Sequence, residues 1–281
     1  MTASPLRSIA LCADDFALHP AVDEAVERLL LAGRLSATSC MTTAPLWKQA
    51  ALRLPALRPR LSVGLHFNLT EGHGVQAGQG IGAVIAKAYT ARLSSAALRS
   101  QWQRQLDDFE DALGTPPDFI DGHQHVHQLP AVRAALALEL QERYGKAGLP
   151  MPWVRSTVPA GGLFKQPKAS IIAALGGWTT TRQLRSRKLA QNLGFGGVYG
   201  FDAATPEAYG EHMQQWLAEL GDGSLMMCHP AVSPVPGDAI GEQRAVEFAY
   251  LQSDAFGQAL EQAGCTIAQG PLLPLFTADK Y

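Results

Sequence analysis

The chain has 281 residues, of which 47% are hydrophobic and 17% are charged, and its formal net charge at pH 7 is −2. This length allows one large α/β domain or two ordinary ones, and the apolar content supplies a substantial core, which excludes an intrinsically disordered protein. The small net charge and the lack of a long basic run argue against nucleic acid as a partner.

Cysteine spacing and hydropathy bear on where the protein works. The four cysteines lie far apart with no CxxC pair, and we expect free, buried thiols at Cys12, Cys40, Cys228 and Cys265. Residues 1–8 lack the apolar region of a signal peptide, and no stretch reaches the length of a membrane span. We therefore expect a cytoplasmic protein. No repeat or linker divides the chain, so we expect a single domain over residues 1–281.

The first predicted strand covers residues 8–13, and Asp14 and Asp15 follow it directly. Two adjacent carboxylates at the end of a buried strand fit a polar site. They also fit the N-cap of a helix, because Pro20 and an amphipathic run over residues 22–31 come next. Both interpretations remain open on this segment alone.

The next elements bring a histidine to a second strand end. We expect a strand over 36–43, a helix over 44–54 and a strand over 61–70, with His66 and Asn68 near the end of the last. Parallel α/β folds gather ligands at the carboxyl ends of their strands. This position makes His66 a candidate ligand rather than only a structural residue. The glycine-rich segment 71–82 is a predicted active-site loop, in which His73 either reaches substrate or lies exposed.

A third strand end carries the densest group of metal-ligating side chains. An amphipathic helix over 94–113 leads into a short apolar run and then to Asp121, His123, His125 and His127 at alternate positions. If the strand stays regular, its period of two places all four side chains on one face. Imidazoles clustered with a carboxylate are the usual composition of a site for a divalent metal.

The remainder of the chain adds one more strand end. The further predicted elements are a helix over 130–144, a strand over 154–157, a helix over 206–220, a strand over 224–228, one long helix over 244–263 and a short strand over 266–268. Arg155 would face the cavity, and His229 directly follows the strand over 224–228. Residues 161–200 are less regular, with helical patterning from residue 171 and around 184–193. They contain no nucleotide-binding motif and are interpreted as an excursion over the site.

Four strand-end motifs therefore follow one another: Ala13-Asp14-Asp15-Phe16, Gly64-Leu65-His66-Phe67-Asn68-Leu69-Thr70, Asp121-Gly122-His123-Gln124-His125-Val126-His127 and Met227-Cys228-His229-Pro230. Together they resemble the YdjC-like (ChbG/HpnK) carbohydrate deacetylases, from about residue 9 to residue 263. The resemblance implies a distorted (β/α) barrel related to the polysaccharide deacetylases, and a divalent cation that serves the removal of acetyl groups from N-acetylated sugars. Two small departures are Ala17, where the family usually has Gly, and Gly122, where it usually has Ser.

Carried over by position, the resemblance assigns the metal to Asp15, His66 and His123 and the general base to Asp14, and it matches His229 to the histidine of the final motif. His229 would then protonate the departing amine as general acid. The chemistry agrees, because one carboxylate and two imidazoles leave open positions for a water and a carbonyl oxygen. The side chains expected to bind substrate or to support the ligands from behind are His125, His127, Arg155 and Asn68.

Several alternatives remain open at this point. Imidazole ligands favour Zn²⁺, whereas the resemblance to the family implies Mg²⁺. Both ions therefore remain candidates for the metal site. Two histidines with a carboxylate also occur in non-haem iron oxygenases, which do not need Asp14 or His229. Another metallohydrolase of amide or phosphate ester bonds, or a non-catalytic carbohydrate-binding protein, would use the same scaffold. The acetylated substrate is a chitooligosaccharide, another amino sugar or a lipid-linked glycan, and a homodimer is compatible with the sequence.

Overall fold

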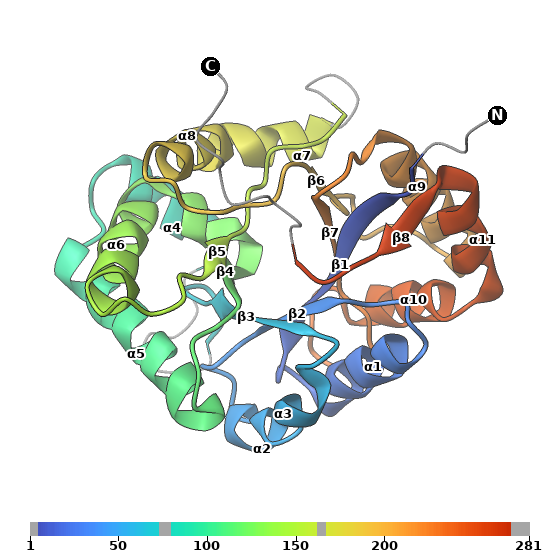
Figure 1. The fold of residues 1–281 in the computed structure, drawn as a ribbon, viewed down its shortest axis with the longest axis horizontal. Coiled ribbons are helices and arrows are strands. Elements are labelled where there is room, and N and C mark those ends of the chain that lie inside the picture. The colour runs from blue at the N-terminus through green and yellow to red at the C-terminus, as the bar shows by residue number, and fades with distance from the viewer. Residues whose placement is uncertain (1–4, 73–79, 162–166, 271–281) are drawn as a thin grey trace.

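Parallel strands form the centre of the molecule, and helices surround them (Figure 1). The computed structural model describes residues 5–72, 80–161 and 167–270. The strands are β1 (Arg7–Phe16), β2 (Ala37–Cys40), β3 (Ser62–Phe67), β4 (Phe119–Gly122), β5 (Trp153–Val154), β6 (Phe195–Gly196), β7 (Ser224–Cys228) and β8 (Cys265–Ile267). Within the described ranges every pair of these strands is parallel.

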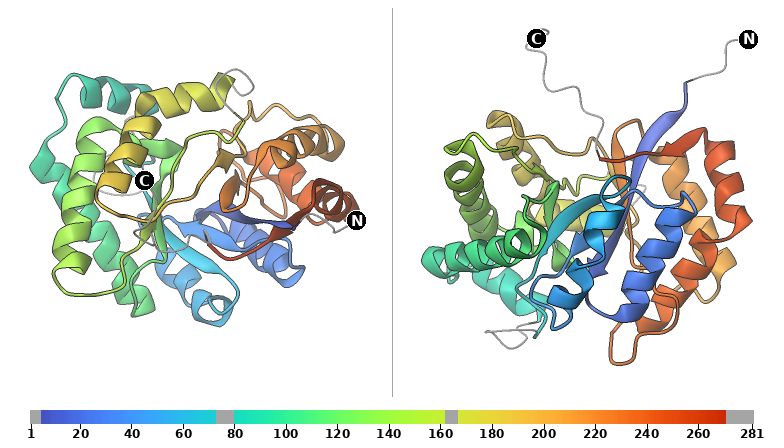
Figure 2. Two further views of the ribbon diagram at one scale, coloured as in Figure 1. Left: turned by 45° about the horizontal axis from the view of Figure 1, so that its top comes forward. Right: turned by 60° about the horizontal axis from the view of Figure 1, so that its bottom comes forward.

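Helices lie on the outside of this sheet, as two further views show (Figure 2). The α-helices are α1 (Pro20–Leu31), α2 (Trp47–Ala51), α3 (Leu54–Leu57), α4 (Ile81–Tyr89), α5 (Ser95–Leu113), α6 (Pro130–Leu140), α7 (Pro167–Ile172), α8 (Trp178–Ser186), α9 (Pro206–Glu219), α10 (Gly241–Leu251) and α11 (Asp254–Ala263). Short turns of other helix types are η1 (His123–Gln128), η2 (Gln141–Gly145) and η3 (Ala173–Gly177). None of the described helices is both long and apolar enough to cross a membrane.

The sheet closes into a distorted barrel. Its order is β5-β4-β3-β2-β1-β7-β6, with β8 paired to β1. A parallel bridge between Pro159 and Phe195 joins the segment after β5 to β6, so the two ends of this order meet. The expected distorted (β/α) barrel is confirmed.

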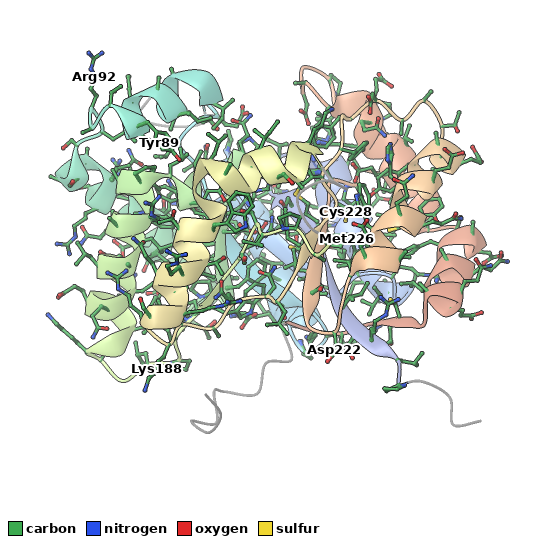
Figure 3. All side chains as sticks on the ribbon, turned by 90° about the horizontal axis from the view of Figure 1, so that it is seen from above. Tyr89, Arg92, Lys188, Asp222, Met226 and Cys228 are labelled. Carbon is green, nitrogen blue, oxygen red and sulfur yellow. The ribbon has the colours of Figure 1, made fainter. Side chains whose placement is uncertain are left out.

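Strand β1 occupies the middle of the sheet, and every residue from Ile9 to Phe16 is buried. A parallel strand covered on both sides requires such a continuous apolar run, which the sequence shows. Cys12 pairs with Met227 and Ala13 with Cys228, so β7 ends beside Ala13, three residues before the end of β1. Figure 3 shows Met226 and Cys228 further toward one end of the barrel than Asp222, which precedes β7.

The prediction of an amphipathic helix over 94–113 is confirmed in α5. The Ser94 hydroxyl caps its first turn by accepting from the Ala97 amide, and Gly114 ends it with a φ of +69°. The face made of Leu98, Trp102, Leu106 and Phe109 is buried, as its spacing predicts.

Several element predictions were wrong. The helix expected over 44–54 is two short helices, α2 and α3. The long helix expected over 244–263 is also two helices, because Ser253 has an extended backbone between α10 and α11. Helix α4 was not predicted. The helical patterning noted within 161–200 corresponds in part to α7, η3 and α8, although residues 187–193 are not helical.

Candidate active site

Asp14 and Asp15 both line one cavity at the end of β1, although neighbouring residues of a regular strand point to opposite faces. The strand is irregular here: its register with β2 shifts between Ala13 and Phe16, and Asp15 has a φ of +70°. Ala17 follows with a φ of +75°. Asp is one of the residues that tolerate this left-handed conformation. The irregularity allows two adjacent carboxylates to serve one site.

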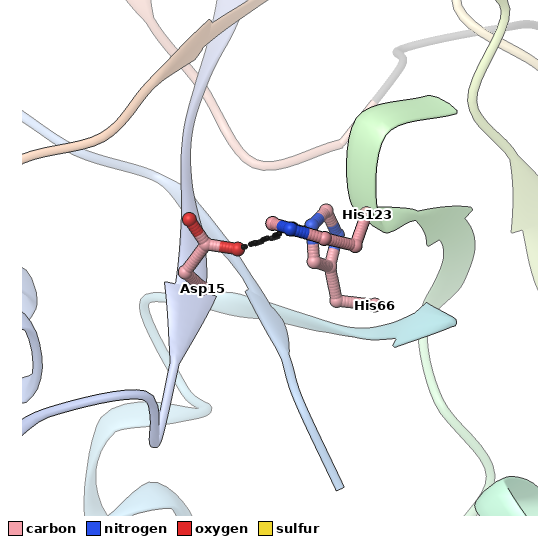
Figure 4. A group of neighbouring side chains, drawn as sticks. All are labelled: Asp15, His66 and His123. Atoms are coloured by element: carbon pink, nitrogen blue, oxygen red, sulfur yellow. Dashed lines mark hydrogen bonds and ion pairs between the residues drawn. The ribbon is translucent and has the colours of Figure 1, made fainter. Parts of the chain in front are cut away.

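Asp15, His66 and His123 meet around one point (Figure 4). Asp15 Oδ1 lies 3.3 Å from His66 Nε2 and 3.0 Å from His123 Nδ1. One ligand atom from each of the three lies within 4.8 Å of those of the other two. His66 is the fifth residue of β3, and His123 directly follows β4. The structure therefore brings together the three residues that the sequence suggested for a metal.

The outer nitrogen of each imidazole ring is held by a carboxylate. Asp121 Oδ1 lies 2.7 Å from His66 Nδ1, and Glu71 Oε1 lies 3.1 Å from His123 Nε2. Such contacts fix the orientation of metal-ligating histidines. Sequence reasoning assigned neither carboxylate this role, although Asp121 is adjacent to the predicted strand end.

The electrostatics of this group favour positive charge. Burial lowers the pKa of the His66 imidazole, but the carboxylates of Asp121, Asp15 and Asp14 together outweigh burial and raise that pKa to about 10. Burial likewise lowers the pKa of His123, but Asp15 and Glu71 together outweigh it and raise that pKa above its ordinary value. The surrounding carboxylates therefore suit a cation at this point.

Asp14 is paired with the fully buried guanidinium of Arg155. Nη1 donates to Asp14 Oδ2 at 2.7 Å, and Nη2 donates to Oδ1 at 2.6 Å. Burial alone would raise the pKa of the Asp14 carboxyl, but Arg155 outweighs burial and holds that pKa well below its usual range. Arg155 is not among the residues that line the cavity, so it holds Asp14 from behind.

The prediction that Asp121, His123, His125 and His127 share one strand face was wrong. β4 ends at Gly122, and the chain turns into η1, where Gln124 and His125 have φ values of +51° and +59°. The alternation of a strand does not continue through residues in the left-handed region.

The four residues expected to support the site therefore have different positions. His125 lines the cavity. His127 is fully buried, its Nε2 lies 3.1 Å from the Arg155 carbonyl oxygen, and burial lowers its pKa to about 4. Asn68 is also buried, and its Oδ1 accepts from the Thr70 and Glu71 amides. Only His125 of these three lines the cavity, whereas His127 and Asn68 shape the backbone around it.

His229 follows β7 and lines the same cavity. The pairing of Ala13 with Cys228 places it at the level of Asp14, on the neighbouring strand. Its backbone amide donates to Glu247 Oε2 at 2.6 Å, and the Tyr199 hydroxyl donates to the other carboxylate oxygen at 2.6 Å. Glu247 is fully buried on α10 and was missed by sequence reasoning, which treated it as part of a helix.

The cavity that these residues line has a volume of about 760 Å³. Its wall includes aliphatic side chains of α4 and α7, among them Ile81, Ile85 and Ile171, and the segment 235–240 that follows β7. His73 of the predicted active-site loop belongs to residues 73–79, which lie outside the described residues. The arrangement places a candidate cation site, a carboxylate and an imidazole on one pocket of ligand size.

The chain is similar to known proteins over most of its length. A family model described as YdjC-like protein matches residues 8–262. A chitooligosaccharide deacetylase of Klebsiella pneumoniae is 24% identical over 268 residues, covering 92% of this chain and 96% of that protein. A human carbohydrate deacetylase is 32% identical over 151 residues, covering 49% of this chain.

The matches to the human and mouse carbohydrate deacetylases span only about half of those proteins, 46% and 49% of their lengths. Among solved structures, a putative cellobiose-phosphate cleavage protein of Enterococcus faecalis has a TM-score of 0.67 at 19% identity, covering 95% of this chain and 98% of that one. At this identity the likeness concerns the fold.

Proposed function

This chain belongs to the YdjC-like protein family, and from that premise we propose that it is a metal-dependent carbohydrate N-deacetylase. The observation that carries the proposal is the convergence of Asp15, His66 and His123 in a cavity that Asp14 and His229 also line. A candidate cation site beside a potential base and a potential acid is what metal-assisted amide hydrolysis requires.

The donor set fits a divalent cation. Asp15, His66 and His123 would hold it, and the carboxylates of Asp121 and Glu71 would keep the two imidazole rings in place. Two imidazoles favour Zn²⁺, while Mg²⁺ prefers oxygen, so either metal is to be tested. When bound, the cation supplies a water of lowered pKa and polarises the amide carbonyl.

The chain's own residues would handle the protons. Asp14 stays ionised because of Arg155, and the paired guanidinium fixes the carboxylate in one orientation. It would accept the proton of the attacking water. His229, on the neighbouring strand, would donate a proton to the departing amine, which is a poor leaving group until it is protonated.

The substrate class follows from the relatives. Relatives along nearly the whole chain, such as the Klebsiella pneumoniae protein, are named chitooligosaccharide deacetylases. An oligosaccharide of N-acetylated amino sugars is therefore the first substrate to test. Other N-acetylated amino sugars and lipid-linked glycans come next.

Acetate release from a panel of these saccharides tests the proposal. The purified protein, loaded with Zn²⁺ or Mg²⁺, should release acetate from at least one member, and Asp14→Asn should release far less. A phosphate ester assayed in parallel should not be cleaved. Cleavage of the phosphate ester alone would contradict the proposal and show that the protein is a phosphoesterase. Saccharide binding without acetate release under any metal would leave a carbohydrate-binding protein.

A further inference from the structure

Arg244, in the first turn of α10, connects two parts of the cavity wall. Its side chain is buried, with 1% of the residue exposed. Nη2 donates to Asp15 Oδ2 at 2.7 Å, and Nε donates to Asp238 Oδ2. Asp238 belongs to the segment 235–240 of the wall, and its other carboxylate oxygen accepts from the Ile240 amide at 3.1 Å. Arg244 thus ties this segment to the end of β1.

The remaining nitrogen of Arg244, Nη1, is buried and has no hydrogen-bond partner within the described part of the chain. His125 and His229, which line the same cavity, also have a ring nitrogen for which the described residues supply no partner. A neutral imidazole nitrogen can remain unprotonated, whereas a guanidinium nitrogen always carries hydrogens. A buried donor without an acceptor costs folding free energy. Because Arg244 lines the cavity, a bound ligand is the natural source of the missing acceptor.

The surroundings of Arg244 indicate what kind of acceptor fits. Its positive charge already faces two carboxylates, those of Asp15 and Asp238, so a neutral oxygen suits the remaining donor better than a further anion. Arg244 contacts Oδ2 of Asp15, whereas the two histidines contact Oδ1. With the cation held by Oδ1 and the two imidazoles, as proposed, the amide under attack would lie on that side, and a different part of the sugar would face Arg244.

We propose that Arg244 is a substrate-contacting residue: Nη1 donates a hydrogen bond to a hydroxyl oxygen of the N-acetylated saccharide, while Nη2 and Nε fix Asp15 and the segment 235–240. This inference rests on the proposed function, because it takes a saccharide as the ligand of the cavity. Its consequence is selectivity, since an acetyl compound without a sugar makes no use of Nη1.

Arg244→Lys tests the contact, because an ammonium group keeps the charge beside Asp15 but lacks the planar fork. The Zn²⁺-loaded variant should lose roughly 10- to 100-fold in kcat/KM on an N-acetylated chitooligosaccharide, the effect of one hydrogen bond to a charged donor. On 4-nitrophenyl acetate the loss should be much smaller, because the ester makes no contact with Nη1. Zn²⁺ affinity, measured by calorimetry, should fall by much less than kcat/KM on the saccharide, because the ammonium keeps a positive charge beside Asp15. Arg99→Lys on α5, where the side chain is 40% exposed, is the matched control and should behave as the wild type.

Equal losses on the saccharide and the ester, or a loss of Zn²⁺ affinity that accounts for the whole effect, would overturn the contact and leave Arg244 as a support for Asp15. The wild type offers a second route that does not depend on the folding of the variant. Calorimetric binding of monodeoxy analogues of the saccharide should show one hydroxyl whose removal weakens binding strongly, and a panel without such a position would also overturn the contact. A wild type that binds the saccharides but releases no acetate would contradict the proposed function alone.

Discussion

At the scale of single residues, neighbouring charges give two adjacent aspartates different properties. Asp14 faces a buried guanidinium on Arg155, and Asp15 lies between two histidines and Arg244. The carboxylate of Asp15 directed at the imidazoles is suited to a cation, while that of Asp14 is fixed beside it and stays ionised. Their environments, rather than their order in the sequence, support the proposal of Asp15 as a ligand and Asp14 as a base.

Exchanging each aspartate should separate these roles. Asp15→Ala should lose the metal and the activity together, because it removes the only carboxylate in the group of three. Asp14→Asn should keep metal affinity, measured by calorimetry, but lose about 10²- to 10⁴-fold in turnover, the usual effect of removing a general base. Near-normal deacetylation by Asp14→Asn at saturating metal would move the base elsewhere, with His125 the first candidate.

His229 should affect substrates according to their leaving groups. In its proposed role as general acid it would protonate the amine, so His229→Ala should reduce turnover of an N-acetylated sugar by about 10²- to 10⁴-fold. An activated acetyl ester, whose leaving group needs no proton, should be affected much less. Equal losses on the two substrates would make His229 a structural residue at the end of β7.

The positions of the candidate ligands could be predicted from the sequence where location at a strand end decided them, while their roles stay predictions. His66 and His123 stand at strand ends, and a parallel sheet brings such ends together. Arg244, Glu247 and the contacts of Asp121 were not assigned roles, because their partners lie far away in the chain, as Asp15 does from Arg244. Helical spacing gives no sign that two buried charges of α10 reach two different strands.

At the scale of elements, the turn from β1 into α1 decides how the aspartates point. Ala17 is buried and has a φ of +75°, a conformation that costs a residue with a Cβ about 1–2 kcal/mol. Ala17→Gly should therefore stabilise the fold by up to about 1 kcal/mol after the larger chain entropy of glycine is counted. Thermal unfolding should show the midpoint rise, and Ala13→Gly in the regular part of β1 should lower it. A lower midpoint for Ala17→Gly would contradict the account of the turn.

Asp23 on α1 should make stability depend on pH. Its Oδ1 accepts from the Ala17 amide at 2.7 Å, and burial raises its pKa from 3.8 to about 6. A folded-state pKa above the unfolded one means that stability is fully present below about pH 3.8 and is lost as pH rises through about 6. Asp23→Asn keeps the acceptor and removes this loss.

Denaturant unfolding of the wild type and Asp23→Asn across this range measures the effect. The variant should gain up to about 3 kcal/mol relative to the wild type between pH 4 and pH 7. Comparison of the two proteins cancels the other titrating groups. A difference in unfolding free energy that does not change with pH would show that Asp23 has the same pKa in both states.

Element prediction failed where tertiary contacts changed a local pattern. The alternating histidines after β4 suggested a strand, but left-handed residues in η1 end it, and His127 turns to the backbone of Arg155. The apolar pattern over 244–263 is continuous, yet Ser253 separates α10 from α11. Periodicity records which face is buried but not where the chain bends to meet its neighbours.

At the scale of the molecule, the barrel brings distant motifs together. Asp14 and Asp15, His66, His123 and His229 come from the ends of four strands, and the sheet order places β1 between β2 and β7. The fold class and this gathering were predictable, because strand ends of a parallel barrel share one edge. The near-closure through Pro159 and Phe195 was not, since one bridge leaves no pattern in the sequence. A single domain, a cytoplasmic location and a homodimer stay predictions.

Metal titration of the stripped protein tests the central claim most directly. Protein treated with a chelator and freed of it should release no acetate from an N-acetylated chitooligosaccharide. Activity should then rise linearly with added Zn²⁺ or Mg²⁺ to about one equivalent of the tighter metal, as one site with three protein ligands requires. Asp15→Ala should stay inactive throughout the titration. Full acetate release by the metal-free wild type, or restoration of Asp15→Ala by the metal, would contradict a metal-dependent deacetylase centred on Asp15, His66 and His123.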